Sequence, residues 1–129
     1  TGESGPLRVV PQVCYDLRFP AWSRIQDGSE LLLYVANWPA ARRDQWLTLL
    51  KARAIENLCY VIAVNRVGTD GNNVGYAGDS CVIDYRGEMV LQLGDTESLA
   101  TIELDLAGLQ AYRESFPAYL DADHFIISD

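Results

Sequence analysis

Residues 31–64, LLLYVANWPAARRDQWLTLLKARAIENLCYVIAV, decide the fold because they hold two continuous apolar runs with a helical pattern between them. The runs, 31–36 and 59–64, are of the kind found in strands that are covered on both faces. Between the runs, apolar side chains recur at three- and four-residue steps over residues 42–57, while charged side chains fall elsewhere. This stretch therefore predicts two central, parallel strands joined by a helix.

The flanking segments extend this pattern in both directions. On the amino-terminal side, residues 7–13 predict a strand in which Pro11 indicates a bulge or a sheet edge, and residues 19–25 predict a short helix. On the carboxyl-terminal side we expect a loop over 69–73, a hairpin of 80–84 with 88–93, a half-exposed strand over 99–104 and a helix over 106–114 that ends before Pro117. The order predicts a two-layered α/β domain with parallel strands first and antiparallel strands later.

Composition limits the class of protein. A length of 129 residues predicts one domain, 1–129, and 49% hydrophobic with 22% charged residues are globular proportions. The net charge of −8 argues against a nucleic-acid partner, because such a partner needs a positive face for its phosphates. The longest apolar run, 58–64, is far shorter than a membrane span and no signal-peptide pattern opens the sequence, so we expect no membrane association.

Three cysteines, Cys14, Cys59 and Cys81, are an odd number without the paired spacing of a redox or zinc motif. This argues against a disulfide framework and a zinc site, and it fits a reducing, cytoplasmic setting. Cys59 and Cys81 lie inside apolar strand patterns, so they are expected to be buried. No metal site and no cofactor is predicted.

Cys14 differs from the other two because it stands where a strand meets a helical segment. Such a sharp turn exposes a nucleophile beside backbone N–H groups. Arg18 and the start of the helix would favour the thiolate form of Cys14. The alternative is that Cys14 is a small buried hydrophobic residue, and its placement alone leaves both interpretations open.

Four blocks of sequence carry a family resemblance. In order they are VCYDLRFP at 13–20, ARAIEN at 52–57, NRVG at 65–68, and GDS at 78–80 with DYRGE at 84–88. Their order and spacing resemble the carbon-nitrogen hydrolases of the nitrilase superfamily. Two further stretches, YVANWP at 34–39 and FPA at 116–118 with DAD at 121–123, resemble its omega-amidase branch. The resemblance covers nearly the whole chain but only the carboxyl-terminal half of the family's domain.

This resemblance implies a nitrilase-like α-β-β-α sandwich that carries a catalytic Glu-Lys-Cys trio, of which the chain supplies Cys14. Family members place the glutamate and the lysine before the segment matched here, so neither is assigned to a residue of this sequence. Lys51, the only lysine, is expected to be a solvated helix residue. We therefore expect the chain alone to be nearly inactive. We also expect it to pair with the other half of the domain or with a second copy, because half a sandwich leaves an apolar face open.

The implied reaction releases ammonia from the terminal amide of a small dicarboxylic or 2-oxo acid. The sulfur of Cys14 attacks the amide carbon, ammonia leaves, and water hydrolyses the thioester. The backbone N–H of Tyr15 is the oxyanion donor that this chain can supply. The alternative is a non-catalytic interaction or assembly module, and a remote third one is a Cys-His hydrolase, which would need His124 beside Cys14.

Three further residues are candidates for binding the substrate. By resemblance, Arg18 lies near the pocket, although it could equally be a structural ion-pair partner of Asp16. Asn37 and Trp38 follow a central strand at its carboxyl end, where α/β sheets bind ligands, although the same residues could simply lead into a helix. Arg53 and Glu56, three residues apart on the predicted helix, are expected to form a scaffold ion pair.

Overall fold

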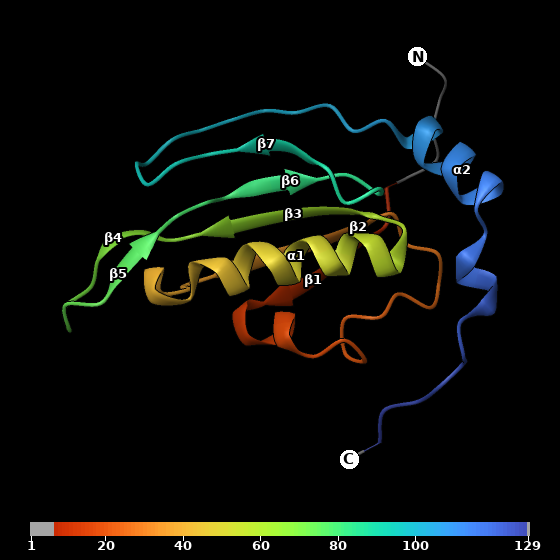
Figure 1. Cartoon of the computed structure of the whole chain (residues 1–129), viewed down its shortest axis with the longest axis horizontal. Helices are drawn as coiled ribbons and strands as arrows, with labels where there is room; N and C mark the ends of the chain where they lie inside the picture. Colours follow the sequence, from red (N-terminus) through yellow and green to blue (C-terminus); the bar gives the residue numbers. More distant parts are fainter. Residues whose placement is uncertain (1–6, 129) are drawn as a thin grey trace.

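The computed structural model describes residues 7–128 and contains one five-stranded sheet (Figure 1). Its strand order is β1-β2-β3-β6-β7, with bounds of Val9–Val13, Leu31–Ala36, Tyr60–Asn65, Cys81–Ile83 and Met89–Gln92. Strands β1, β2 and β3 are parallel, whereas β6 and β7 join antiparallel. This confirms the predicted change of direction, and β1, which contains Pro11, lies at the sheet edge as expected.

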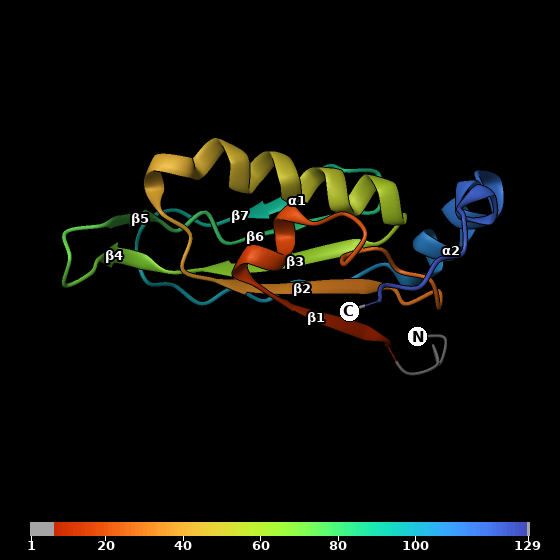
Figure 2. The same ribbon diagram turned by 90° about the horizontal axis from the view of Figure 1, so that it is seen from below.

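One helix covers one face of the sheet. Helix α1 (Arg43–Asn57) follows the short 3-10 helix η2 (Ala40–Arg42), and the edge-on view in Figure 2 places α1 on one side of the strands. Its buried side chains pack into a core with residues of β2, β3 and β6, and this core includes Trp46, Leu50, Ala54, Leu32, Tyr34 and Val61. The predicted strand-helix-strand unit is therefore confirmed.

The second helix packs at the other face and end of the sheet. Helix α2 (Leu106–Ser115) inserts Leu109 into a cluster with Tyr60 and Val82, and both views place it beyond the end where β2 and β3 begin. Asp105 caps this helix, because its side chain accepts a hydrogen bond from the Gly108 N–H at 2.8 Å. A last 3-10 turn, η3 (Ala118–Asp121), follows Pro117.

Two of the predicted elements are wrong. Residues 19–25 form no helix but a turn over 20–23, and the helical segment lies earlier, as the 3-10 helix η1 (Cys14–Arg18). Phe19 is extended, with φ −114° and ψ 98°, because the ring of Pro20 disfavours helical geometry in the residue before it. Residues 99–104 form no strand, because they have no hydrogen-bonded partner strand among the described residues. The apolar side chains of Ile102 and Leu104 instead pack against the cluster that contains Leu109 of α2.

The predicted loop over 69–73 is mostly correct but hides a short hairpin. Strands β4 (Val67–Thr69) and β5 (Gly75–Ala77) form a separate two-stranded sheet that projects from the main one. Asp70 closes its turn by accepting hydrogen bonds from the N–H groups of Asn72 and Val74 at 2.8 and 3.0 Å. The predicted hairpin of β6 and β7, with Gly87 at its turn, is confirmed.

The face of the sheet opposite α1 is apolar and open near the carboxyl ends of the parallel strands. Val13, Val35 and Val64 lie side by side in register across β1, β2 and β3. Their exposed fractions are 62%, 47% and 50%, although β-branched residues in central strands, as Val35 and Val64 are, are usually covered. In the part of the chain that the structure describes, no helix is long and apolar enough to cross a membrane.

Candidate active site

The carboxyl ends of the three parallel strands meet at one edge of the sheet, and the candidate residues gather there. Cys14 follows β1, Asn37 follows β2 and Arg66 follows β3. The register brings Val13 beside Val35, so the residues that leave these two strands are neighbours. This edge is where open α/β sheets place their ligands.

Cys14 stands at a strained bend between β1 and η1. Its φ is +43°, in the left-handed region that residues other than glycine rarely adopt and that costs about 1–3 kcal/mol. Two contacts hold the bend. Leu17 is fully buried in the core, and Asp16 Oδ2 accepts a hydrogen bond from the Val13 N–H at 2.9 Å. The sharp strand-to-helix turn that the sequence predicts is therefore present.

The Cys14 side chain is half-buried, between the two interpretations left open by the sequence. It packs against the α1 core, and its thiol donates a hydrogen bond to the backbone carbonyl of Asn37, with 3.9 Å between sulfur and oxygen. The sulfur is thus oriented along the carboxyl edge. Its role as nucleophile stays a prediction of the sequence, as does the role of the Tyr15 N–H, although Tyr15 itself is 66% exposed.

A buried arginine fixes the η1 turn from the helix layer. Arg53 donates two hydrogen bonds to the backbone carbonyl of Leu17, from Nε at 3.0 Å and from Nη2 at 2.8 Å. The predicted pair with Glu56 is also present, at 3.3 Å. Sequence reasoning identified the ion pair but missed the contact with Leu17, which makes Arg53 a positioning residue for the turn that carries Cys14.

Arg18 packs over Trp38, two residues after the end of β2. Its Nη2 donates to Gln45 Oε1 at 2.5 Å, and its guanidinium carbon lies 4.8 Å from the centre of the Trp38 ring. The alternative ion pair with Asp16 is wrong for the described residues, because that carboxylate is engaged with the Val13 N–H instead. Arg18 therefore lies between Trp38 and Gln45, in the same layer as the Cys14 turn.

Trp38 is nearly fully buried, with 3% of its surface exposed. Asn65 holds its backbone on both sides: Oδ1 accepts from the Trp38 N–H at 2.7 Å, and Nδ2 donates to the Trp38 carbonyl at 3.2 Å. The same Nδ2 donates to Gly78 at 2.9 Å. Asn65 and Gly78 belong to sequence blocks that carried the family resemblance, and they act here as links between neighbouring strand ends.

Asn37 differs from its neighbour because its side chain is exposed and its carbonyl faces Cys14. Pro39 follows as the residue before η2, so these residues do lead into a helix as one alternative held. A pocket-lining role for Asn37 and Trp38 stays a prediction. Among residues 7–128, no group of three His, Cys, Asp or Glu side chains is placed to hold a metal ion.

Asp79 organises the far side of this edge. It is buried with φ +55°, forms an ion pair with Arg43, and accepts a hydrogen bond from Gln92 at 3.1 Å. Its hydrogen bond and charge raise the pKa of Arg43 above its ordinary value. The Trp46 indole N–H also donates to its backbone carbonyl at 3.1 Å. Sequence reasoning used residues 78–80 only for the family resemblance and did not predict that Asp79 links Arg43, Gln92 and Trp46.

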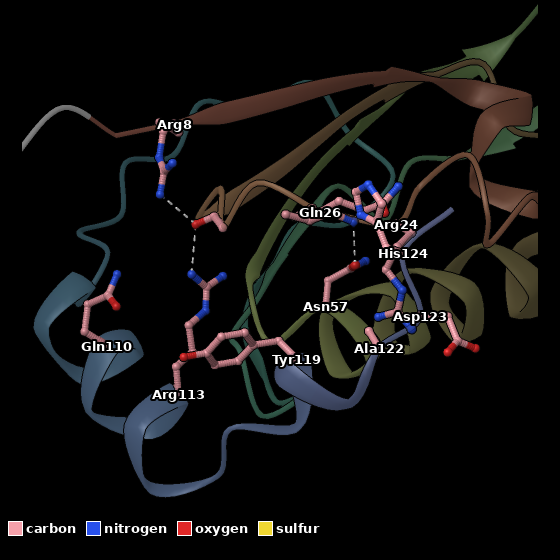
Figure 3. A pocket seen from close by; sticks show the side chains of 12 residues that line it. Arg8, Arg24, Gln26, Asn57, Gln110, Arg113, Tyr119, Ala122, Asp123 and His124 are labelled. Carbon is pink, nitrogen blue, oxygen red and sulfur yellow. Dashed lines mark hydrogen bonds between the residues drawn. The ribbon is translucent and has the colours of Figure 1, made fainter. Parts of the chain in front are cut away.

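The other candidate groups lie away from the edge. Cys59 and Cys81 are buried as predicted, and burial raises the pKa of each thiol to about 12. Lys51 is exposed on α1, as expected. His124 is exposed in the tail, where Figure 3 shows it near Arg24 at a cavity whose lining does not include Cys14, so the described residues offer no Cys-His pair.

Comparison with known proteins gives consistent matches. The carbon-nitrogen hydrolase family model matches residues 2–114. The omega-amidase YafV of Yersinia enterocolitica is 56% identical over 93% of this chain and 47% of its own length. The 2-oxoglutaramate amidase of Bacillus subtilis is 41% identical over 84% of this chain and 42% of its own length. The chain thus spans about half the length of these relatives.

A solved structure agrees with the fold. The protein XC1258 from Xanthomonas campestris, described as a CN-hydrolase superfamily protein with an arsenic adduct in the active site, superposes with a TM-score of 0.91. The two sequences are 49% identical over 93% of this chain and 48% of the other. The predicted nitrilase-like α/β fold is confirmed by this match.

Proposed function

This chain belongs to the carbon-nitrogen hydrolase family of the nitrilase superfamily, in its omega-amidase-like branch, and from that premise we propose that it carries the nucleophile of an amidase. The substrate is the terminal amide of a small dicarboxylic or 2-oxo acid. The observation that carries this proposal is the strained bend at Cys14, which presents a half-buried thiol at the carboxyl edge of three parallel strands. No observation favours the alternative of a non-catalytic assembly module.

The proposed reaction has two halves that use the same geometry. The sulfur of Cys14 gives up its proton and attacks the amide carbon, so that a negative charge forms on the carbonyl oxygen. The C–N bond then breaks as the nitrogen takes up the proton from the thiol and leaves as ammonia. Water then attacks the thioester carbon, which releases the acid and restores the thiol. The Tyr15 backbone N–H is the donor to the oxyanion that this chain supplies, and loss of one such donor typically slows catalysis by about 10²- to 10³-fold.

Arg18, Asn37 and Trp38 are the proposed substrate-binding residues. Arg18 is the positive group in the same layer as the Cys14 turn, and Gln45 engages only one of its nitrogens. Its remaining N–H groups suit the carboxylate of the substrate. Trp38 is almost fully buried, so little of its surface is available to the substrate. Its main contribution is to position the Arg18 guanidinium, which lies over its ring.

The open valine face supports a proposal about pairing. Val13, Val35 and Val64 form an apolar strip that a second layer would cover, and the relatives are about twice as long as this chain. We propose that the rest of the domain covers this strip and supplies the glutamate and lysine of the trio, with a second copy as its substitute when the chain is alone. Three free thiols, one of them half-buried, fit a reducing, cytoplasmic setting.

Ammonia release from 2-oxoglutaramate tests this function in the protein that contains this chain. We expect Cys14→Ala to reduce the rate to that of the uncatalysed reaction. Cys59→Ala is the matched control, because it removes a buried thiol just before β3, at the amino end of that strand, and keeps the activity. Undiminished ammonia release by the Cys14→Ala variant would refute the proposal.

A further inference from the structure

A cavity of about 300 Å³ lies at the end of the sheet opposite Cys14 (Figure 3). Its walls come from the segments just before β1, β2 and β3, from α2 and from the tail after η3. These are the amino ends of the parallel strands, whereas Cys14 and Asn37 stand at their carboxyl ends. The cavity is therefore a separate place in the fold.

Arg113 brings a buried positive charge to this cavity. Only 8% of the residue is exposed, and its guanidinium donates to three backbone carbonyls: Nε to Leu58 at 2.9 Å, Nη1 to Gly28 at 3.0 Å and Nη2 to Ser29 at 2.9 Å. Backbone carbonyls orient the group but do not neutralise it. Within residues 7–128, no carboxylate lies at ion-pair distance from Arg113. Burial of such a charge is costly unless an anion accompanies it.

Arg24 adds a second charge with most of its donors unused. Its Nη1 donates to the Glu56 carbonyl at 2.6 Å, and a guanidinium has five N–H groups. Arg24 also forms no ion pair in the described part of the chain. Arg8 differs, because it is paired with Glu30 at 3.4 Å. Among residues 7–128, the cavity thus collects two arginines without an ion-pair partner, against the single lining carboxylate of Asp123.

The tail closes one side of the cavity through a specific contact. Gln26 Nε2 donates to the Phe125 carbonyl at 3.1 Å, and the Phe125 N–H donates to Gln26 Oε1 at 3.3 Å. These two bonds join segments that are 99 residues apart in sequence. They hold residues 122–124, which line the cavity, in place beside Arg24.

We propose that this cavity, here called the arginine pocket, binds a small doubly charged oxyanion through Arg24 and Arg113. Guanidinium groups pair with carboxylate and phosphate oxygens through parallel N–H bonds, and two guanidiniums suit two negative charges. The volume is at the lower end of the range for small-molecule sites, which limits the ligand to a small one. A dicarboxylate and a phosphate share this chemistry.

Calorimetric titration of the protein that contains this chain tests the pocket, with succinate and inorganic phosphate as separate probes and chloride at matched ionic strength. We expect saturable binding of at least one probe, with one site per chain. Arg24→Gln should weaken it about tenfold or more, because charge-assisted hydrogen bonds are lost. Arg42→Gln is the matched control, since it removes an equal charge from an exposed arginine outside the pocket and leaves the affinity unchanged.

A second variant protects the test against a folding defect. Gln110 is exposed at the pocket wall, so Gln110→Glu adds a negative charge without removing a buried contact and should also weaken binding. Binding of phosphate alone or of succinate alone supports the site when Arg24→Gln weakens it, and it identifies which anion the pocket takes. The proposal is overturned if neither probe binds more tightly than chloride, or if Arg24→Gln, Gln110→Glu and Arg42→Gln all bind as the unaltered protein does.

Discussion

The side chain of Asn65 clamps the backbone of Trp38 by accepting from its N–H at 2.7 Å and donating to its carbonyl at 3.2 Å. This clamp fixes the chain where β2 ends, one residue after Asn37, whose carbonyl accepts the thiol hydrogen of Cys14. The end of β3 is thereby coupled to the orientation of the sulfur through two consecutive residues, Trp38 and Asn37.

Asn65→Ala should lower the free energy of unfolding by about 2–3 kcal/mol, because three hydrogen bonds are lost and their buried backbone partners stay unpaired. Urea denaturation measures this change. Asn72→Ala is the control, since that side chain is exposed in the β4–β5 turn and its loss should change stability by less than about 0.5 kcal/mol. Equal stabilities for the two variants would contradict the clamp.

Gly87 turns the β6–β7 hairpin with φ +86°, and a Cβ there would lie 2.7 Å from Cδ1 of Ile55. Gly87→Ala should therefore destabilise the protein by about 1–2 kcal/mol, through the left-handed backbone and this close contact. At Gly71 the backbone carries no such strain and a Cβ meets nothing within 4 Å. Gly71→Ala should be neutral or slightly stabilising, and a loss equal to that of Gly87→Ala would count against this account.

Stability should fall in alkali. Burial raises the pKa of Cys81 from 9.0 to about 12 and that of Tyr34 from 10.0 to about 12. Because these groups ionise at lower pH in the unfolded chain, their stabilisation is complete below about pH 9 and is lost as the pH rises toward 12. Urea midpoints measured from pH 8 to 11 test this trend, and Cys81→Ala should make the fall less steep. A constant midpoint up to pH 11 would contradict it.

The 129-residue chain alone should associate in solution through its open face. Val35 and Val64 are about half exposed in central strands, and burying such apolar surface is favourable. Small-angle scattering should show a dimer or a larger species, and Val64→Lys should shift it toward the monomer. Thr48→Lys, on the exposed side of α1, is the control and should leave the association unchanged. A monodisperse monomer of the unaltered chain would contradict the prediction.

The sequence predicted those parts of the fold whose pattern is local. The apolar runs and the helical periodicity of residues 31–64 identify β2, α1 and β3, and the break after β1 identifies the bend at Cys14. The helix expected over 19–25 does not form, because Pro20 disfavours helical geometry in the residue before it.

Contacts between distant segments could not be predicted in this way. Arg18 pairs with Gln45, 27 residues away, and Arg53 holds the Leu17 carbonyl, 36 residues away. The sequence alone favours the nearby acidic residues, Asp16 for Arg18 and Glu56 for Arg53. The distant partners become available only when η1 packs against α1. The arginine pocket was missed for the same reason, since Arg24 and Arg113 come to line one cavity only through the packing of α2 and the tail.

The most direct test of the central claim is the mass of the cysteine peptides after treatment of the protein with acrylamide, followed together with ammonia release. Cys59 and Cys81 are buried with raised thiol pKa values, so the single adduct should fall on Cys14, and activity should disappear in proportion to it. Full modification of Cys14 with undiminished ammonia release would contradict the claim that this sulfur attacks the amide.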